Sequence, residues 1–164
     1  MARADYAIES IFTKELTDAE WDWLTDFEER LRQADRRELI AAAGDAWTAI
    51  DTSIVNSEAC YRVSGDKGQP LVLYGRCKVD GIPGRLIWCV ATDELKPYER
   101  EFARVSRKIL QEWAEEFGIL WNAVGEFNEP AMRWLKWCGA EFGKPLDMGG
   151  EKFIRFYIRR TENV

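Results

Sequence analysis

The sequence predicts an α/β (α+β) fold, with helices flanking a mixed, mostly antiparallel sheet that holds a central parallel strand pair. Two short continuous apolar runs, 86–91 (LIWCVA) and 119–124 (ILWNAV), are typical of strands buried on both faces. The amphipathic stretch 99–117 lies between them and makes the unit long enough for a right-handed parallel crossover. Segments 58–79 and 142–159 pair short strand patterns across glycine-containing turns, which is typical of antiparallel strands.

Length and composition predict one domain that spans residues 1–164. The chain is 46% hydrophobic and 13% aromatic, enough for a full core. No apolar run approaches the ~20 residues that span a bilayer, and the first ten residues lack an apolar signal region. We therefore expect a cytoplasmic protein without a membrane partner. The net charge of −6 argues against a nucleic-acid partner, which would usually require a basic stripe.

The absence of histidine excludes several kinds of site. It removes the usual zinc ligand and the usual general base near neutral pH, and it rules out a Ser-His-Asp triad. The four cysteines, Cys60, Cys77, Cys89 and Cys138, form no Cys-x-x-Cys pair. The sequence predicts no metal site.

The N-terminal part predicts one strand and at least two helices. The strand is expected at Ala7–Thr13. Thr17 begins a helix, with Glu20 at the capping-box position. A second helix is predicted over Asp35–Ala43, ending before a glycine. Residues 46–55 fit either a helix or a strand, and the early part of the stretch favours a helix.

The central part reads as strands joined by tight turns. Strands are predicted at 58–64 and 71–79, separated by the Gly-Asp-Lys-Gly turn at 65–68. A second turn at 80–84 leads into the strand at 86–91.

After the crossover helix, Asn128 is expected to cap a short helix that carries Pro130 in its first turn. Gly139 is placed to end that helix. Two last strands are predicted at 142–146 and 152–159. Trp113, Trp134 and Trp137 are expected in the core, with a partner-binding patch as the alternative.

This order and a few residues at fixed spacing resemble the GNAT (GCN5-related N-acetyltransferase) superfamily. The matching pieces are Asn122-Ala123-Val124, then Asn128-Glu129-Pro130-Ala131, then Gly139-Ala140 followed by Phe142. Over residues 70–160 the chain also resembles a family of short tailed-phage (podovirus) internal virion proteins that look like GNAT folds. That resemblance rests on LWNAVGEFN, a Trp-Leu-Lys helix running into Gly-Ala-x-Phe, and a final Phe-rich strand.

The GNAT resemblance implies that the two parallel strands splay apart and that the pantetheine arm of acetyl-CoA lies in the gap like an added strand. It implies that the following helix points its N-terminus at the pyrophosphate. The candidate bases that accept a proton from the amine are Asp93, Glu94 and Glu126. The candidate acetyl-CoA contacts are Val90, Ala91, Thr92, Lys96, Arg100, Arg104, Asn122, Asn128 and Ala131.

The chain departs from the GNAT pattern at two places. The glycine-rich phosphate loop is replaced by Thr92-Asp93-Glu94-Leu95-Lys96-Pro97-Tyr98. Leu135 stands where these enzymes commonly place the tyrosine that protonates the leaving thiolate, which leaves Tyr74, Tyr98, Tyr157 or water as replacements.

Two functions therefore remain open. The first is a phage-encoded, acetyl-CoA-dependent N-acetyltransferase that acts on an amine of a host protein or small molecule. The second is a catalytically inactive GNAT-fold protein that acts in virion assembly or binds a host protein. The intact Asn-x-x-Ala helix supports only the fold.

Overall fold

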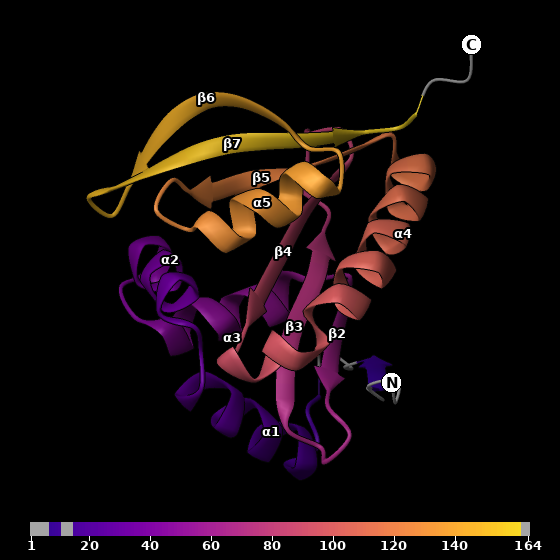
Figure 1. Ribbon diagram of the computed structural model, residues 1–164. Coiled ribbons are helices and arrows are strands. Elements are labelled where there is room, and N and C mark those ends of the chain that lie inside the picture. The colour runs from indigo at the N-terminus through magenta and orange to yellow at the C-terminus, as the bar shows by residue number, and fades with distance from the viewer. Residues whose placement is uncertain (1–6, 11–14, 162–164) are drawn as a thin grey trace.

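The structure is a computed structural model that describes residues 7–10 and 15–161. Seven strands form one sheet in the order β1-β2-β3-β4-β5-β7-β6, and every neighbouring pair is antiparallel except β4 and β5 (Figure 1). The elements are β1 (Ala7–Ser10), α1 (Asp18–Glu29), α2 (Gln33–Ala43), α3 (Ala46–Asn56), β2 (Ala59–Ser64), β3 (Pro70–Cys77), β4 (Arg85–Ala91), η1 (Asp93–Tyr98), α4 (Glu99–Phe117), β5 (Ile119–Gly125), α5 (Glu129–Trp137), β6 (Glu141–Met148) and β7 (Glu151–Arg159). The predicted mixed sheet with one parallel pair is confirmed.

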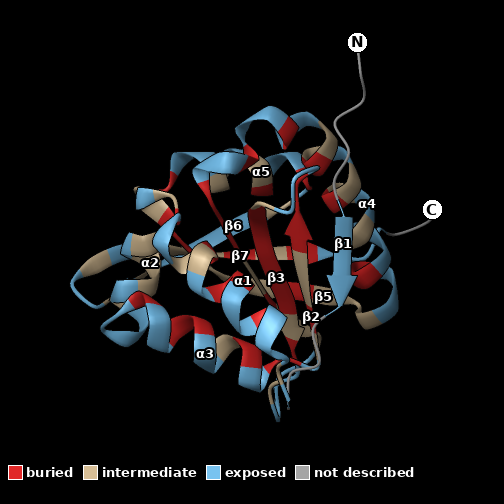
Figure 2. Ribbon diagram, turned by 90° about the horizontal axis from the view of Figure 1, so that it is seen from below, coloured by how far each residue is buried: buried red, intermediate tan, exposed pale blue. Residues whose placement is uncertain are grey.

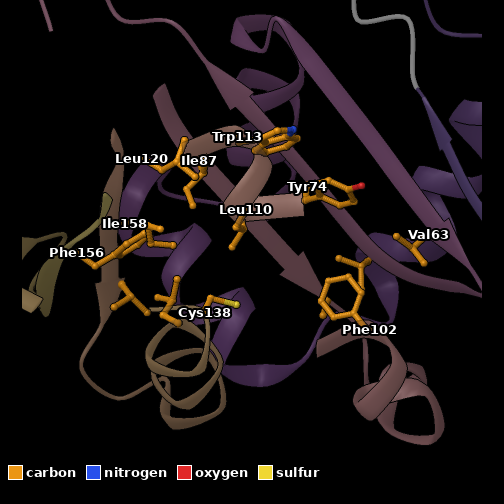
Figure 3. Packing of buried hydrophobic residues seen from close by; sticks show 14 of the residues in the cluster. Val63, Tyr74, Ile87, Phe102, Leu110, Trp113, Leu120, Cys138, Phe156 and Ile158 are labelled. Carbon is orange, nitrogen blue, oxygen red and sulfur yellow. The ribbon is translucent and has the colours of Figure 1, made fainter. Parts of the chain in front are cut away.

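Helices cover both faces of the sheet, and each face has its own apolar cluster. Along β4, Val90 packs with the cluster of α1 and α3, whereas Ile87 and Ala91 pack with that of α4 and α5. Figure 3 shows the second cluster, in which Tyr74 and Trp113 lie close together. The central strand β3 is almost wholly buried, and β1 at the edge is exposed (Figure 2). The alternation of side chains along the strands assigns the residues to the two faces.

Local sequence rules account for the helix ends. Thr17 and Glu20 form the predicted capping box, and the Asn128 side chain accepts a hydrogen bond from the Ala131 N–H. Residues 46–55 lie in a helix, which Asp45 caps through the Thr48 N–H. The described part of the first strand ends at Ser10, because residues 11–14 of the predicted range lie outside the described residues.

Two features differ from the sequence-based expectation. The segment between β4 and α4 is a short 3-10 helix, η1, rather than a loop. Trp137 is 53% exposed, so its placement in the core is wrong, and the Arg107 guanidinium lies over its ring. None of the helices in the described part of the chain combines the length and apolar character needed to cross a membrane.

The parallel strands β4 and β5 touch only where they begin. Arg85 pairs with Leu120 and Leu86 with Trp121, and these are the two backbone pairs that join β4 to β5 in the described part of the chain. β4 nevertheless pairs with β3 from Leu86 to Ala91, and β5 pairs with β7 along its whole length. Each strand therefore stays in the sheet through its outer neighbour while the two diverge from each other, as the GNAT resemblance implied.

Gly84 lies at the point where the two strands converge. Its φ of +81° belongs to a region that favours glycine, and a Cβ built on it would stand 2.0 Å from the carbonyl oxygen of Ile119. Gly81, in the turn before it, has a similar φ of +78° but open space around the position of a Cβ. The close approach of Ile119 therefore sets Gly84 apart.

We predict that Gly84→Ala lowers the free energy of unfolding more than Gly81→Ala does. Both variants carry the backbone cost of a positive φ, about 1–3 kcal/mol. Only Gly84→Ala adds the overlap with Ile119, for about 1–3 kcal/mol more. Urea unfolding of the two variants measures the difference. Equal losses would show that the strands do not converge against Gly84.

Candidate active site

The Asn122 side chain takes the place of strand pairing just beyond the last paired residues. Its amide nitrogen donates to the Ile87 carbonyl oxygen across the gap at 2.7 Å, and its oxygen accepts from the Ala123 N–H at 2.8 Å. A polar group in an apolar strand needs such partners. From the sequence, Asn122 could either bond backbone across the splayed strands or face outward, and the structure shows the bond across the strands.

Helix α2 closes the other end of the gap. The Asp35 carboxylate accepts from the Ala91 N–H and from the Asn128 amide, both at 2.8 Å. The Arg32 backbone N–H donates to the Ala91 carbonyl oxygen at 3.0 Å, and its guanidinium pairs with Asp35 at 3.0 Å. Asp35 and Asn128 are almost wholly buried, with exposed fractions of 1% and 0%. Because both backbone groups of Ala91 are bonded by α2 and its N-cap residue Arg32, the end of β4 is anchored without β5.

The Glu38 carboxylate lies one helical turn further along α2 and accepts from the Gly125 N–H of β5 at 2.6 Å. Asp35 and Glu38 are thus joined to the two diverging strands, Asp35 to β4 and Glu38 to β5. We call the space between the strands, from Asn122 to these two carboxylates, the window.

Cys89 is the β4 residue whose backbone faces the window. Backbone groups alternate along a strand, so Cys89 shares the inner edge with Ile87 and Ala91. The Asn122 side chain bonds the Ile87 carbonyl oxygen, and the Asp35 side chain bonds the Ala91 N–H. No backbone pairing joins Cys89 to β5 within the described residues. The window therefore leaves one residue's backbone edge available to an extended ligand.

A cavity of about 290 Å³ reaches the window from both faces of the sheet. Glu38 and Ser53 line it from α2 and α3, and Ser106 and Trp134 line it from α4 and α5. Most of its wall is apolar. A second, more open hollow of about 500 Å³ beside α3 shares residues with the cavity, among them Trp88 and Asn122. The window thus opens toward both layers of helices, and on the α4–α5 side the Trp134 indole donates to the Ser106 hydroxyl at 2.8 Å.

Burial, together with the nearby Asp35 carboxylate, raises the pKa of Glu38 to about 7, although the hydrogen bond from Gly125 opposes the shift. A carboxylate that titrates near neutral pH is suited to accept and release protons. Burial also raises the pKa of the Cys89 thiol, so this thiol stays protonated and is a poor nucleophile.

Sequence reasoning missed Glu38 and pointed to other carboxylates. Asp93, Glu94 and Glu126 are all exposed, and Glu94 pairs with Arg30 at 3.1 Å. Their role as bases stays a prediction. One signal could have pointed to Glu38. At three- and four-residue spacing, Asp35, Glu38 and the apolar Leu39 lie on one face of a helix. A carboxylate on the apolar face of a helix is rarely buried without a partner, so it indicates a special role.

The predicted acetyl-CoA contacts fall into three groups. Val90, Asn122 and Ala131 line the cavity, and Ala91 borders the window. Thr92 and Asn128 are fully buried and committed to bonds within the chain: Thr92 donates to Leu71 and Pro70, and Asn128 donates to Asp35.

The third group, Lys96, Arg100 and Arg104, is exposed along η1 and α4, and Arg104 pairs with Glu101 at 3.0 Å. No glycine occurs in η1, which is anchored instead by its buried Leu95 and Tyr98 side chains. The Tyr98 hydroxyl donates to the Asp66 carboxylate at 2.6 Å. The cations thus lie beside a closed turn that lacks a backbone cradle for phosphate.

Among the three tyrosines left open as proton donors, Tyr74 lines the cavity. It is paired with Cys89 in the register of β3 and β4, and its ring stacks on Tyr61 of β2 at 5.2 Å and packs against Trp113 of α4 at 6.0 Å. Tyr157 lies on β7, outside the lining of the cavity. The described residues contain no cluster of three potential metal ligands.

No protein-family model and no curated protein matches the sequence. Solved structures do match. The chain aligns with spermidine N-acetyltransferase from Vibrio cholerae, in complex with CoA and spermine, at a TM-score of 0.63 and 13% identity, over 94% of this chain and 95% of that one. An acetyltransferase of the GNAT family from Bacillus anthracis aligns at a TM-score of 0.63 and 14% identity, over 96% of this chain and 96% of that one.

The ribosomal-protein-S18-alanine N-acetyltransferase from Escherichia coli aligns at a TM-score of 0.63 and 10% identity, over 98% of this chain and 97% of that one. Identities this low carry the fold and leave the chemistry to the site. The chain is similar along nearly its whole length to acetyltransferases of the GNAT family, and it has their fold.

Proposed function

We propose that this chain is an N-acyltransferase that transfers an acyl group from a pantetheine thioester, such as acetyl-CoA, to an amine within the window. The observation that carries this proposal is the divergence of β4 and β5 after two residue pairs, beside a cavity lined from both faces of the sheet. Donor and acceptor need opposite approaches to one reacting centre, and this geometry offers them.

The residues of the window fit the acyl-bearing arm of such a donor. The free backbone edge of Cys89 is suited to pair with an extended amide chain, as an added strand would. The apolar wall of the cavity excludes water from the thioester. When bound, the thioester supplies an activated acyl carbon that an amine attacks with release of a thiol.

The residues near the end of β4 do not fit the diphosphate end of CoA. The turn η1 carries Asp93 and Glu94, and α4 begins with Glu99 and Glu101, so carboxylates surround the position where a diphosphate would need N–H groups. Lys96, Arg100 and Arg104 supply only exposed positive charge. The pantetheine arm of acetyl-CoA, rather than its nucleotide end, therefore supplies most of the binding energy in this proposal.

The side chains of the window have separable tasks in this proposal. Asn122 holds Ile87 and Ala123 and so fixes the width at which the strands diverge. Tyr74, beside Cys89, donates a proton to the departing thiolate. The acceptor is an amine of a host protein or a small molecule, consistent with the resemblance to phage proteins.

A second candidate function is a GNAT-fold phage protein without catalysis, active in virion assembly or in binding a host or virion protein. One observation favours it: α2 already bonds both backbone groups of Ala91, so part of the edge that the cofactor arm would use is occupied. The two candidates differ in whether any thioester binds in the window.

We predict that acetyl-CoA and acetyl-pantetheine both raise the melting temperature, and that their dissociation constants differ by less than about tenfold. A ligand at ~100 times its Kd adds about 2.7 kcal/mol of stability. The small difference follows because no backbone cradle holds the diphosphate. Differential scanning fluorimetry and calorimetric titration measure both values.

The same samples test transfer, with spermidine and an alanine-initiated peptide as acceptors because the structural neighbours are named for a polyamine and a protein alanine. Absence of any thermal shift at millimolar donor, together with no thiol release, would reject the enzyme and favour the second candidate. A loss of affinity far above tenfold for acetyl-pantetheine would refute the view that the arm dominates binding.

We predict that Tyr74→Phe lowers kcat at least tenfold while the Kd of the donor stays within about twofold, because only the hydroxyl proton is removed. Tyr157→Phe is the matched control, since Tyr157 is outside the cavity lining. Single-turnover kinetics separate the acyl-transfer step from the binding of the donor. Equal rates for the two variants would exclude Tyr74 as the proton donor.

A further inference from the structure

We infer that Glu38 of α2 is the catalytic residue that removes the proton from the acceptor amine, and that the acceptor enters from the α2–α3 face of the sheet. This inference rests on the proposed function and assigns a residue and a direction of approach within it. None of the carboxylates singled out by the sequence is buried at the window.

Position is the first argument. The Glu38 carboxylate lines the cavity, and one of its oxygens is held by the Gly125 N–H at 2.6 Å. This bond fixes the carboxylate at the inner edge of β5, opposite the free edge of Cys89 on β4. A base must lie within hydrogen-bond reach of the reacting amine, and the window brings the two strand edges to one place.

The surroundings of Glu38 are the second argument. From its own helix, the Asp35 carboxylate opposes ionisation of Glu38 and the Arg32 guanidinium favours it. The neighbours from the other elements are the Gly125 N–H of β5, the Asn128 amide of α5 and the protonated Cys89 thiol of β4. Asp35 is already paired with Arg32, Ala91 and Asn128, which leaves Glu38 as the carboxylate in the window without a cationic partner of its own.

The side from which the acceptor enters is inferred from the residues that line the cavity and the hollow beside it. The cavity reaches Thr52 and Ser53 of α3, and the open hollow beside it adds Asn56, Lys78 and Asp80. Beside the Lys78 ammonium group, the α2–α3 side thus offers hydroxyl, amide and carboxylate groups that can bind the ammonium ion of an acceptor. On the α4–α5 side, the polar groups of Trp134 and Ser106 that line the cavity already bond each other.

The proton step is balanced within the chain. The ammonium group of the acceptor loses one proton to the Glu38 carboxylate, which becomes a neutral carboxyl group, and the freed lone pair forms the new C–N bond. The C–S bond of the thioester then breaks, Tyr74 gives its proton to the departing thiolate, and the second proton of the nitrogen restores the Tyr74 hydroxyl as the amide forms. After the amide product leaves, the carboxyl group returns its proton to water through the open hollow.

The test is Glu38→Gln, which preserves an oxygen to accept from Gly125 but cannot take up a proton. We expect kcat/KM for the acceptor to fall at least 100-fold, with the Kd of acetyl-pantetheine within about twofold of the wild-type value. The wild-type rate should rise with pH through about 7, the pKa of Glu38, and this limb should vanish in Glu38→Gln. Glu94→Gln, at an exposed carboxylate, is compared in parallel.

A second readout does not depend on activity. Folded Glu38 keeps its proton up to pH about 7, whereas an unfolded glutamate releases it near the ordinary value of 4.5. Unfolding therefore releases a proton between these values, and wild-type stability should fall as pH rises from 5 to 7 and stay level above 7 as far as Glu38 contributes. Glu38→Gln should lose this dependence, and Glu116→Gln on the exposed surface of α4 should retain it.

The outcomes separate this inference from the proposed function. If the wild-type protein transfers the acyl group and Glu38→Gln keeps the same rate and the same pH dependence, Glu38 is not the base. The proposed acyltransferase function would still stand. Loss of activity in Glu94→Gln but not in Glu38→Gln would assign the base to η1. Donor binding without transfer in the wild-type protein would reject both, whereas loss of transfer and of the pH limb in Glu38→Gln with donor binding preserved would support both.

Discussion

The arrangement of this protein depends on how two parallel strands satisfy their backbone groups after they separate. An unpaired N–H or C=O group inside a protein costs free energy comparable to a lost hydrogen bond. Here side chains replace the missing ladder. Asn122 bonds Ile87 and Ala123 where the strands part, and Asp35 and Glu38 bond Ala91 and Gly125 where the gap ends. The window between them is therefore a built feature, stabilised at both ends.

This constraint also explains why two carboxylates of α2 point into the protein, Asp35 buried and Glu38 half-buried. Asp35 is fully buried with its charge matched by Arg32 and by two N–H donors, so it acts as a structural anchor. Glu38 is held by the Gly125 N–H and lies beside the Asn128 amide, it forms no salt bridge within the described residues, and its pKa is raised to about 7. The same helix thus supplies one acid that holds the strands and one that is free to exchange a proton, a division of roles set by their partners.

Local chemistry predicted much of the fold. Thr17 and Asn128 cap helices as expected, glycines end α2 and α4, and apolar runs mark β4 and β5. The site was less predictable because it is made by contacts far apart in the chain: Asp35 lies 93 residues from Asn128, and Glu38 lies 87 residues from Gly125. No local pattern specifies such a pairing. The turn η1 was missed for a different reason, since its buried Leu95 and Tyr98 contacts stabilise a 3-10 helix around Pro97.

The central claim is that the window, with the Cys89 edge at its centre, receives an extended thioester arm. Backbone amide NMR of the labelled protein during titration with acetyl-pantetheine tests this claim most directly. The account predicts that the largest shift changes occur at Cys89 of β4 and Ala123 of β5, the residues that border the window. Changes confined to the outer surface of α4, or no change at millimolar ligand, would contradict it.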